Sequence, residues 1–468
     1  MGNVDGRAII AAWSENVLKT RFEDLDPATV DNAKSRIIDT IGCAIGGAGL
    51  PENAAVAQLV QDWGGSEEAT ILAFGVKAPA HEVAMVNCIL CRSFDWGPLA
   101  IEVDGRRYGT HTSETTVLTA LALAEKQGVG GKELITALVV GDDIAARLFA
   151  ASDRPGPGVG DDRPQALEPW GTVTTFGAAA IAGRLLGLDG PRLHHALGIA
   201  LNMIAGVGSG LWHGATMFKL SQGTSARSGI NAAQLAGAGW TGLADPLFGE
   251  HGSFFAAFAD GCDHPETLTN DLGKKYHVET TFKPYPGGGP TQAPTGEALA
   301  LARKHAIGPE DVEEVTLRLS PPARSPHYMK PFRVGAYPTC DALFSFKYGV
   351  ASALLRGHAR NEDYDEEHVR DPRVLALIDK VTLADLNRSA GFELEVRLKD
   401  GRRLSEPSLQ TVSDRDSPFP RNALNAKFMT QVEYSRMVGK ARAERLLARL
   451  ERLEEDEDVR SLVALAVR

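Results

Sequence analysis

An aspartate and a histidine lie sixteen residues apart in a polar stretch, residues 92–115, which separates two apolar runs of the chain. Asp95 and His111 carry the side chains of a general acid/base pair, because a nearby carboxylate tunes an imidazole to exchange protons near neutral pH. Arg92 and Arg107 in the same stretch are candidates for binding an anionic substrate. The alternative is an ordinary loop in which the aspartate caps a turn and the histidine lies at the surface.

A second pair of candidates lies in MFKLSQGTSARSG, where Lys219 and Arg227 stand near the start of an expected helix. A cation at a helix N-terminus opposes the helix dipole, so its placement there suits an anionic ligand better than it suits stability. We therefore expect these two side chains to lie near one another and to face a negatively charged group. The alternative is a solvated lysine and an arginine whose alkyl chain packs against its neighbours.

Two further loops carry titratable groups. FKPYPGGGP contains Lys283 and Tyr285 beside a turn rich in glycine and proline, and SPHYMKPF contains His327, Tyr328 and Lys330. Each loop alone is typical of a plain linker. Together with the residues above, they place cations, a tyrosine and a histidine on loops of two expected domains, which is the arrangement that an interdomain cleft requires.

The elements that must hold these loops are mostly helices. Residues 1–272 read as one apolar helical run after another, with no period-two alternation, which predicts a large all-helical domain. Residues 273–412 contain alternating runs such as GFELEVRLKDGRRLSEP, a strand pair with a turn, and predict a smaller α+β domain. Residues 413–468 return to helix and are expected to rejoin the helical domain. The predicted fold class is therefore mainly α.

Composition excludes several classes of function. The net charge of −11 and the lack of a basic face argue against a nucleic-acid partner. We find no apolar run long enough to span a membrane and no signal peptide. Five scattered cysteines indicate reduced thiols, so we expect a cytoplasmic protein, and we interpret Cys88 and Cys91 as buried helix residues rather than half of a zinc site.

Motifs for common cofactors are also missing. The chain has no G-x-G-x-x-G after a strand, no Walker A loop, no H-E-x-x-H and no G-x-S-x-G. GGGP at residues 287–290 is a turn rather than a phosphate loop that opens a helix. What remains is an enzyme that uses neither metal nor organic cofactor, or a protein that is not an enzyme.

Motifs along roughly residues 30 to 430 resemble the MmgE/PrpD family, which includes 2-methylcitrate dehydratases, cis-aconitate decarboxylases and iminodisuccinate epimerase. The matching segments are RIIDTIGCAIGG, the stretch from Asp95 to His111, KELITALVVGDDIAARL, TFGAAAIAGRLLGLDG, FKLSQGTSARSGINAAQLAGAGWTG, FKPYPGGGP, FSFKYGVASALLRG and PRNALNAKF. The resemblance implies a large helical domain, a smaller α+β lid, an active site between them and usually a homodimer. It also implies catalysis without metal or cofactor.

The chain departs from the family pattern at several positions. Relatives usually show H-A-L-D-[FY]-D-D where this chain has CRSFDWGP, so the aspartate is kept as Asp95 and the two following acids become Gly97 and Pro98. One family histidine falls near Glu168 and is absent, and another is replaced by Gly288. These changes indicate a divergent branch, whose substrate need not be the usual one.

The resemblance implies removal of a proton or of carbon dioxide next to a carboxylate, through an enolate-like state that cations stabilise. His111 is the expected base, oriented by Asp95, and Tyr328 the expected proton donor. Lys219, Arg227 and Lys283 are expected to bind the substrate carboxylates. The expected site thus comprises the catalytic residues Asp95, His111, Lys219 and Tyr328, and the substrate-binding residues Arg92, Arg107, Arg227, Lys283 and Lys330.

Three functions stay open at this point. Dehydration of a small hydroxy di- or tricarboxylate by a hydro-lyase is our first expectation. The second is epimerisation or isomerisation of a related polycarboxylate, which needs only an acid and a base around one carbon, or its decarboxylation. A carboxylate-binding homologue without activity is the third.

Overall fold

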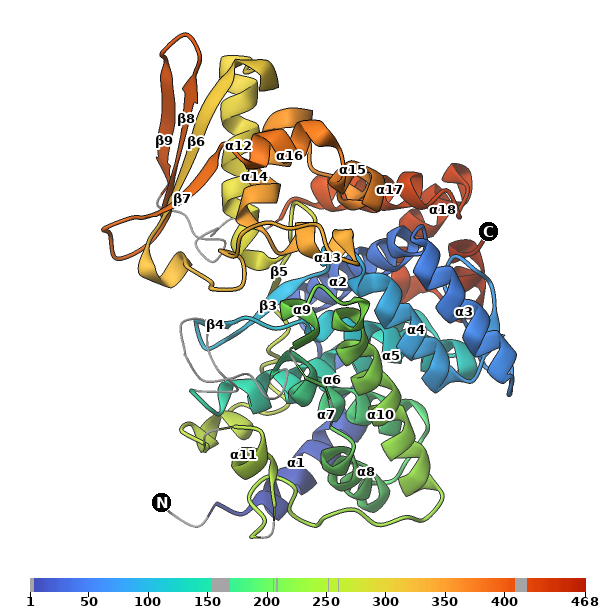
Figure 1. Cartoon of the computed structure of the whole chain (residues 1–468). Coiled ribbons are helices and arrows are strands. Elements are labelled where there is room, and N and C mark those ends of the chain that lie inside the picture. Colours follow the sequence, from blue (N-terminus) through green and yellow to red (C-terminus); the bar gives the residue numbers. More distant parts are fainter. Residues whose placement is uncertain are drawn as a thin grey trace.

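The computed structural model describes residues 4–153, 169–204, 206–207, 209–250, 252–259, 261–408 and 419–468. Most of these residues are helical, and the strands form small sheets. Figure 1 shows a helical body at the lower right and a sheet covered by helices at the upper left. The predicted fold class, mainly α with a smaller α+β part, is confirmed.

The helical body is built around α2, α4, α5, α6, α7 and α10, which pack against one another. Their bounds are Pro27–Gly47, Ala80–Arg92, Thr112–Gln127, Gly131–Ala150, Pro169–Leu185 and Leu220–Gly237. Small residues allow these helices to approach closely: a Cβ atom on Gly177 of α7 would lie 2.7 Å from the carbonyl oxygen of Gly141 on α6. The buried helices give the loops between them a rigid support.

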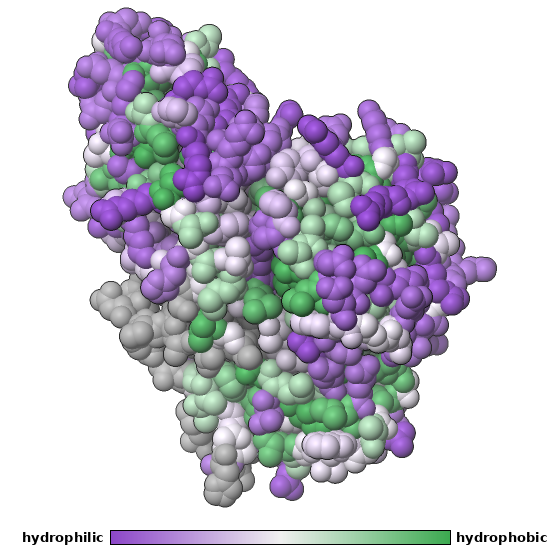
Figure 2. Space-filling view, turned by 45° about the vertical axis from the view of Figure 1, so that its right-hand side comes forward, coloured by the Kyte–Doolittle hydropathy of each residue, from purple (hydrophilic) through white to green (hydrophobic). Residues whose placement is uncertain are grey.

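Further helices cover this centre. α1 (Gly6–Lys19) packs on α8 (Gly190–Asn202), and α3 (Pro51–Trp63) packs on α4. Figure 2 shows hydrophobic surface scattered over the helical body, whereas hydrophilic residues dominate the α/β part at the upper left. Within the described ranges, no helix has both the length and the apolar character that crossing a bilayer requires.

The smaller part is a four-stranded sheet in the order β7-β6-β8-β9. The strands are Val381–Asp385, Val312–Leu319, Phe392–Leu398 and Arg403–Ser408. Buried and less buried residues alternate along β8, as expected for a strand with one face against the core. The predicted turn between β8 and β9 is present, with Gly401 at a φ of 87°. α12 (Gln292–His305) and α14 (Phe346–Arg356) pack together beside this sheet.

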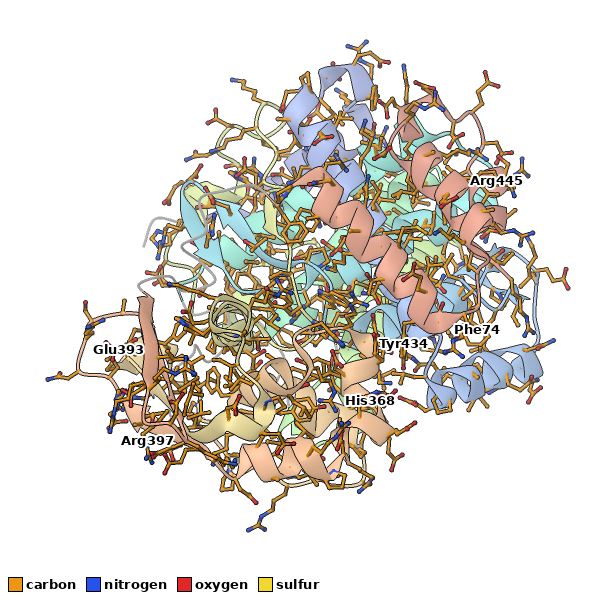
Figure 3. All side chains as sticks on the ribbon, turned by 90° about the horizontal axis from the view of Figure 1, so that it is seen from above. Phe74, His368, Glu393, Arg397, Tyr434 and Arg445 are labelled. Atoms are coloured by element: carbon orange, nitrogen blue, oxygen red, sulfur yellow. The ribbon has the colours of Figure 1, made fainter. Side chains whose placement is uncertain are left out.

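The C-terminal segment lies against the helical body. α17 (Arg421–Ser435) packs on α2, and α18 (Lys440–Leu450) follows it. In Figure 3, Tyr434 lies at the end of α17 near the middle of the molecule, whereas Glu393 and Arg397 lie on β8 at its edge. The ring of Tyr434 meets that of Phe94 edge to face, at 5.2 Å between centroids. The exact division at residues 272 and 412 stays a prediction.

The stretch that we expected to be a loop contains a hairpin instead. β3 (Leu99–Val103) pairs antiparallel with β4 (Arg106–Tyr108), and β5 (Thr280–Thr281) pairs with the other edge of β3. The turn is Asp104-Gly105, with φ angles of 50° and 78°. Asp-Gly between two short β-prone runs is a strong hairpin signal. We interpreted the segment as a loop because of its many charged residues, and therefore did not predict the hairpin. The hairpin carries the chain from Asp95 out to the surface and back to His111.

Candidate active site

Asp95 is the centre of a buried charged cluster. It follows α4 with a φ of 44°, and its side chain is 2% exposed. Lys283, in the loop after β5, donates to the carbonyl oxygen of Asp95 at 2.6 Å, and its Nζ lies 3.0 Å from the carboxylate. Arg92, the last residue of α4, forms an ion pair with the same carboxylate oxygen. Two segments 188 residues apart in the chain are thus joined at Asp95.

The two cations keep Asp95 ionised. Burial alone would raise the pKa of its carboxyl group, but the charges of Arg92 and Lys283 outweigh this and hold the pKa below its usual value. Burial in turn lowers the pKa of Lys283, and the charge of Asp95 opposes that shift. The carboxylate is therefore a fixed negative charge beside the imidazole of His111.

His111 lies between two carboxylates at the start of α5. Its Nε2 is 3.7 Å from Oδ1 of Asp95, and its Nδ1 is 3.1 Å from Oε1 of Glu114. Nη1 of Arg92 lies 3.3 Å from Nδ1 and 3.4 Å from Nε2. Burial, followed by the charge of Arg92, lowers the pKa of His111 well below its ordinary value. The imidazole is therefore neutral at neutral pH, the form that accepts a proton.

Tyr328 approaches this cluster from the α/β part. A Cβ atom on Gly288 would lie 2.0 Å from the hydroxyl oxygen of Tyr328, so the tyrosine fills the space beside that glycine. Its ring packs on those of Phe344 and Phe346, at 5.9 Å and 5.7 Å between centroids. Burial, and then the charge of Asp95, raises the pKa of the Tyr328 hydroxyl well above its ordinary value. The hydroxyl stays protonated and can donate a proton.

Lys219 is held by a separate set of contacts. It ends a short 3₁₀ turn, Thr216–Lys219, directly before α10. Its Nζ forms an ion pair with Glu52 at 2.7 Å and donates to Oδ1 of Asn53 at 3.3 Å. Tyr337 donates its hydroxyl to the same Oε1 of Glu52 at 2.7 Å, and its ring centroid lies 4.9 Å from Nζ of Lys219. Burial lowers the pKa of Lys219, and the charge of Glu52 opposes this.

The other three expected substrate-binding residues, Arg107, Arg227 and Lys330, form ion pairs or hydrogen bonds with residues outside the Asp95 cluster. Arg107 forms an ion pair with Glu102 across the β3–β4 hairpin. Arg227 forms an ion pair with Glu82 on α4 rather than sharing a partner with Lys219. Lys330 is exposed, and its Nζ donates to the carbonyl oxygen of Trp212 at 3.2 Å. The same Nζ lies 4.6 Å from the centroid of the Trp212 ring. Their roles stay predictions.

Several residues of the Asp95 cluster and of the contacts around Lys219 were not singled out in the sequence. Glu114 lies three residues after His111 in the first turn of a helix, a spacing that places both side chains on one face. Glu52, Asn53 and Tyr337 come from distant segments, and no local pattern marks them. Glu168, where a family histidine is missing, lies outside the described residues.

A cavity of about 710 Å³ lies elsewhere, between α1 and α8, and is lined by residues that include Ser14, Leu18, His194 and His195. Its lining shares no residue with the Asp95 cluster. Among the described residues, no three His, Cys, Asp or Glu side chains gather as metal ligands would. The chemistry available at the cluster is that of a neutral imidazole, a protonated phenol and buried cations.

Both halves of the chain match one family. Residues 10–266 match the MmgE/PrpD N-terminal domain, and residues 285–454 match the MmgE/PrpD C-terminal domain. The chain belongs to the MmgE/PrpD family. The resemblance drawn from its motifs is confirmed, and the Asp95 cluster joins residues of both matched domains.

MmgE/PrpD proteins with known activity are similar to nearly the whole chain. It is 27% identical to the cis-aconitate decarboxylase of Mus musculus over 98% of this chain and 93% of the relative. The cis-aconitate decarboxylase of Homo sapiens is also 27% identical, over 98% of this chain and 94% of the relative. That of Aspergillus terreus is 25% identical over 90% and 88%. These relatives are enzymes of the lyase class.

Proposed function

We propose that this chain is a lyase that decarboxylates a small unsaturated polycarboxylate of the cis-aconitate type. Similarity to cis-aconitate decarboxylases over nearly the whole chain is the observation that carries the proposal. The buried cluster supports it, because it brings cations, a neutral imidazole and a protonated phenol to one place. This choice replaces dehydration as the first expectation.

Decarboxylation needs stabilised charge and one proton. The bond between a carbon atom and its carboxylate breaks, carbon dioxide leaves, and the electron pair stays on the carbon as an enolate-like anion. Arg92 and Lys219 are suited to attract the remaining carboxylates and to stabilise this anion. Lys283 is suited to act through Asp95, because both of its contacts are to that residue. Tyr328 then delivers a proton to the carbon. The neutral imidazole of His111 is suited to accept a proton from solvent and to pass it on to the phenolate, which restores Tyr328.

Dehydration is the second candidate, and a specific observation favours it. Elimination of water requires a base that removes a proton and an acid that protonates the leaving hydroxyl. His111 as a neutral imidazole and Tyr328 as a protonated phenol have the protonation states that such a pair requires at neutral pH. The site is therefore also compatible with a hydroxy di- or tricarboxylate.

A panel assay in D₂O separates these functions. Purified protein is incubated with cis-aconitate and with several hydroxy di- and tricarboxylates, each at neutral pH. Release of carbon dioxide from cis-aconitate is the expected result. A new double bond in the ultraviolet without carbon dioxide indicates dehydration, and deuterium uptake without net change indicates isomerisation or epimerisation. Binding of a polycarboxylate by calorimetry, with none of these changes, indicates a non-catalytic homologue.

A homodimer in the cytoplasm is a further part of the proposal. The resemblance to the MmgE/PrpD family supports the dimer, since members of that family usually form homodimers. Light scattering on the purified chain measures the mass in solution, and a mass of one chain at working concentration contradicts the dimer.

A further inference from the structure

Glu114 lies in the first turn of α5 and turns its carboxylate toward His111. Its Oε1 is 3.1 Å from Nδ1 of the imidazole, and its side chain is 0% exposed. We propose that Glu114 is a positioning residue that accepts a hydrogen bond from Nδ1–H of His111 and thereby leaves Nε2 to exchange the proton. Its importance for catalysis rests on the proposed function, whereas its effect on the imidazole does not.

Gly97 provides the space for this carboxylate. A Cβ atom at residue 97 would lie 2.6 Å from Oε1 of Glu114, closer than real Cβ atoms approach an oxygen. The segment that carries Gly97 is fixed from both sides: Trp96 donates its indole N–H to the carbonyl oxygen of Lys283, and Lys427 donates to the carbonyl oxygen of Trp96. Any side chain at residue 97 would therefore displace Glu114 rather than move the backbone.

The position of Glu114 carries a cost in stability. Its second oxygen, Oε2, is buried without a hydrogen-bond partner among the described residues. Burying a carboxylate oxygen without a partner costs free energy, and the charges of Arg92, Lys283 and Arg36 offset part of that cost. The carboxylate has one contact that a catalytic site would use, the hydrogen bond to Nδ1 of His111.

Charged groups from several segments surround Glu114 and His111. They are Arg92 and Asp95 at the end of α4, Lys283 after β5, and Arg36 and Asp39 on α2. Burial raises the pKa of Glu114, and the charges of Arg92, Lys283 and Arg36 oppose this. Because the imidazole is neutral, it carries one proton, and the nearest hydrogen-bond acceptor selects the nitrogen that holds it.

The first test is spectroscopic and needs no substrate. The full chain is labelled with ¹⁵N-histidine, and the resonances of His111 are identified by their loss in His111→Asn. We expect Nδ1 to show the protonated signature and Nε2 the unprotonated one in the wild type and in Glu114→Gln, whose amide oxygen still accepts. In Glu114→Leu the preference for Nδ1–H should disappear. A wild-type imidazole protonated at Nε2, or an unchanged signature in Glu114→Leu, would overturn the proposal.

The second test is kinetic and uses cis-aconitate as substrate. Glu114→Leu should lower kcat by roughly tenfold or more while KM changes little, because the imidazole is misoriented rather than removed. In Glu114→Gln, whose amide oxygen still accepts from Nδ1–H, kcat should stay closer to the wild-type value than in Glu114→Leu. Glu125→Gln is the matched control, a buried glutamate farther along α5 that accepts from Thr70. A normal kcat in Glu114→Leu, or an equal loss of kcat in Glu114→Leu and Glu114→Gln, contradicts the proposal.

Gly97→Ala keeps the test decisive if Glu114→Leu does not fold. It adds one methyl group beside the carboxylate and removes no titratable group, so it should disturb the His111 tautomer and lower kcat in the same direction. A wild-type tautomer and kcat in folded Gly97→Ala would count against the proposal. If the wild type releases no carbon dioxide from cis-aconitate, the proposed function fails, while the spectroscopic result still judges Glu114.

Discussion

The hydroxyl oxygen of Tyr328 occupies the space beside Gly288: a Cβ atom at residue 288 would lie 2.0 Å from it. A side chain at residue 288 would occupy the space that the tyrosine hydroxyl fills. In this chain Gly288 is needed for Tyr328 to reach the cluster, and the two residues are expected to change together.

Gly288→Ala should lower activity by displacing the Tyr328 hydroxyl. We expect a loss of roughly tenfold or more, close to that of Tyr328→Phe, because both variants remove the same proton donor. The double variant should lose little more than either single one, which a double-mutant cycle on kcat measures. Gly439→Ala is the control, since a Cβ atom there meets nothing within 4 Å. Additive losses in the double variant would show that Gly288 does not act through Tyr328.

His111→Ala should abolish most of the turnover. A positioned acid or base contributes roughly 10²–10⁴-fold, and the 7% exposed imidazole of His111 is within reach of both carboxylates of the cluster. His368→Ala removes a histidine on the α/β part, hydrogen-bonded to Asp365, and should leave kcat unchanged. Retention of more than about a tenth of the activity in His111→Ala would exclude it as the base.

Lys283→Met should destabilise the fold strongly. It leaves Asp95 buried with one cation fewer, and breaking a buried ion pair typically costs about 3–5 kcal/mol. Denaturant unfolding measures the loss, and the double variant with Asp95→Asn should recover part of it. Lys275→Ala breaks an exposed pair with Asp104 of similar length and should cost about 1 kcal/mol or less. Equal costs for the two lysines would mean that the Asp95 pair is not desolvated.

Tyr337→Phe should weaken substrate binding through Lys219. The tyrosine hydroxyl and the lysine Nζ both contact Oε1 of Glu52, each at 2.7 Å. Without the hydroxyl, Glu52 is free to hold Lys219 more tightly, so less of its charge is directed to a substrate carboxylate. We expect KM to rise several-fold with a smaller change in kcat. Steady-state kinetics on cis-aconitate tests this, and a fall in kcat alone would contradict it.

His327 should make the protein less stable in mild acid. Burial and then the charge of Lys330 lower its pKa to about 4, whereas an unfolded histidine titrates near pH 6.5. Between these values the unfolded chain binds a proton that the folded chain does not, so stability falls as the pH drops from 6.5 toward 4. His327→Phe should remove roughly 2 kcal/mol of this loss at pH 5 relative to pH 7.5. Denaturant unfolding of both proteins at the two pH values gives the comparison, and parallel pH dependences would refute it.

Much of the fold could be predicted from local patterns. Helical periodicity marked the segments of the body, and alternation with a turn at Gly401 marked β8 and β9, because such patterns report which face of an element is buried. The hairpin between Asp95 and His111 was missed, although its Asp104-Gly105 turn is a local signal.

The sequence by itself determined the family, the mainly α fold and five residues that the cluster contains, Arg92, Asp95, His111, Lys283 and Tyr328. Only the tertiary structure decided their partners. Glu114 in the space beside Gly97, and the tyrosine hydroxyl beside Gly288, depend on how separate segments pack. Residue spacing along the chain predicts which helices and strands form. It does not predict which atoms from distant segments are buried in contact with one another. That shared burial sets the charge states on which the chemistry depends.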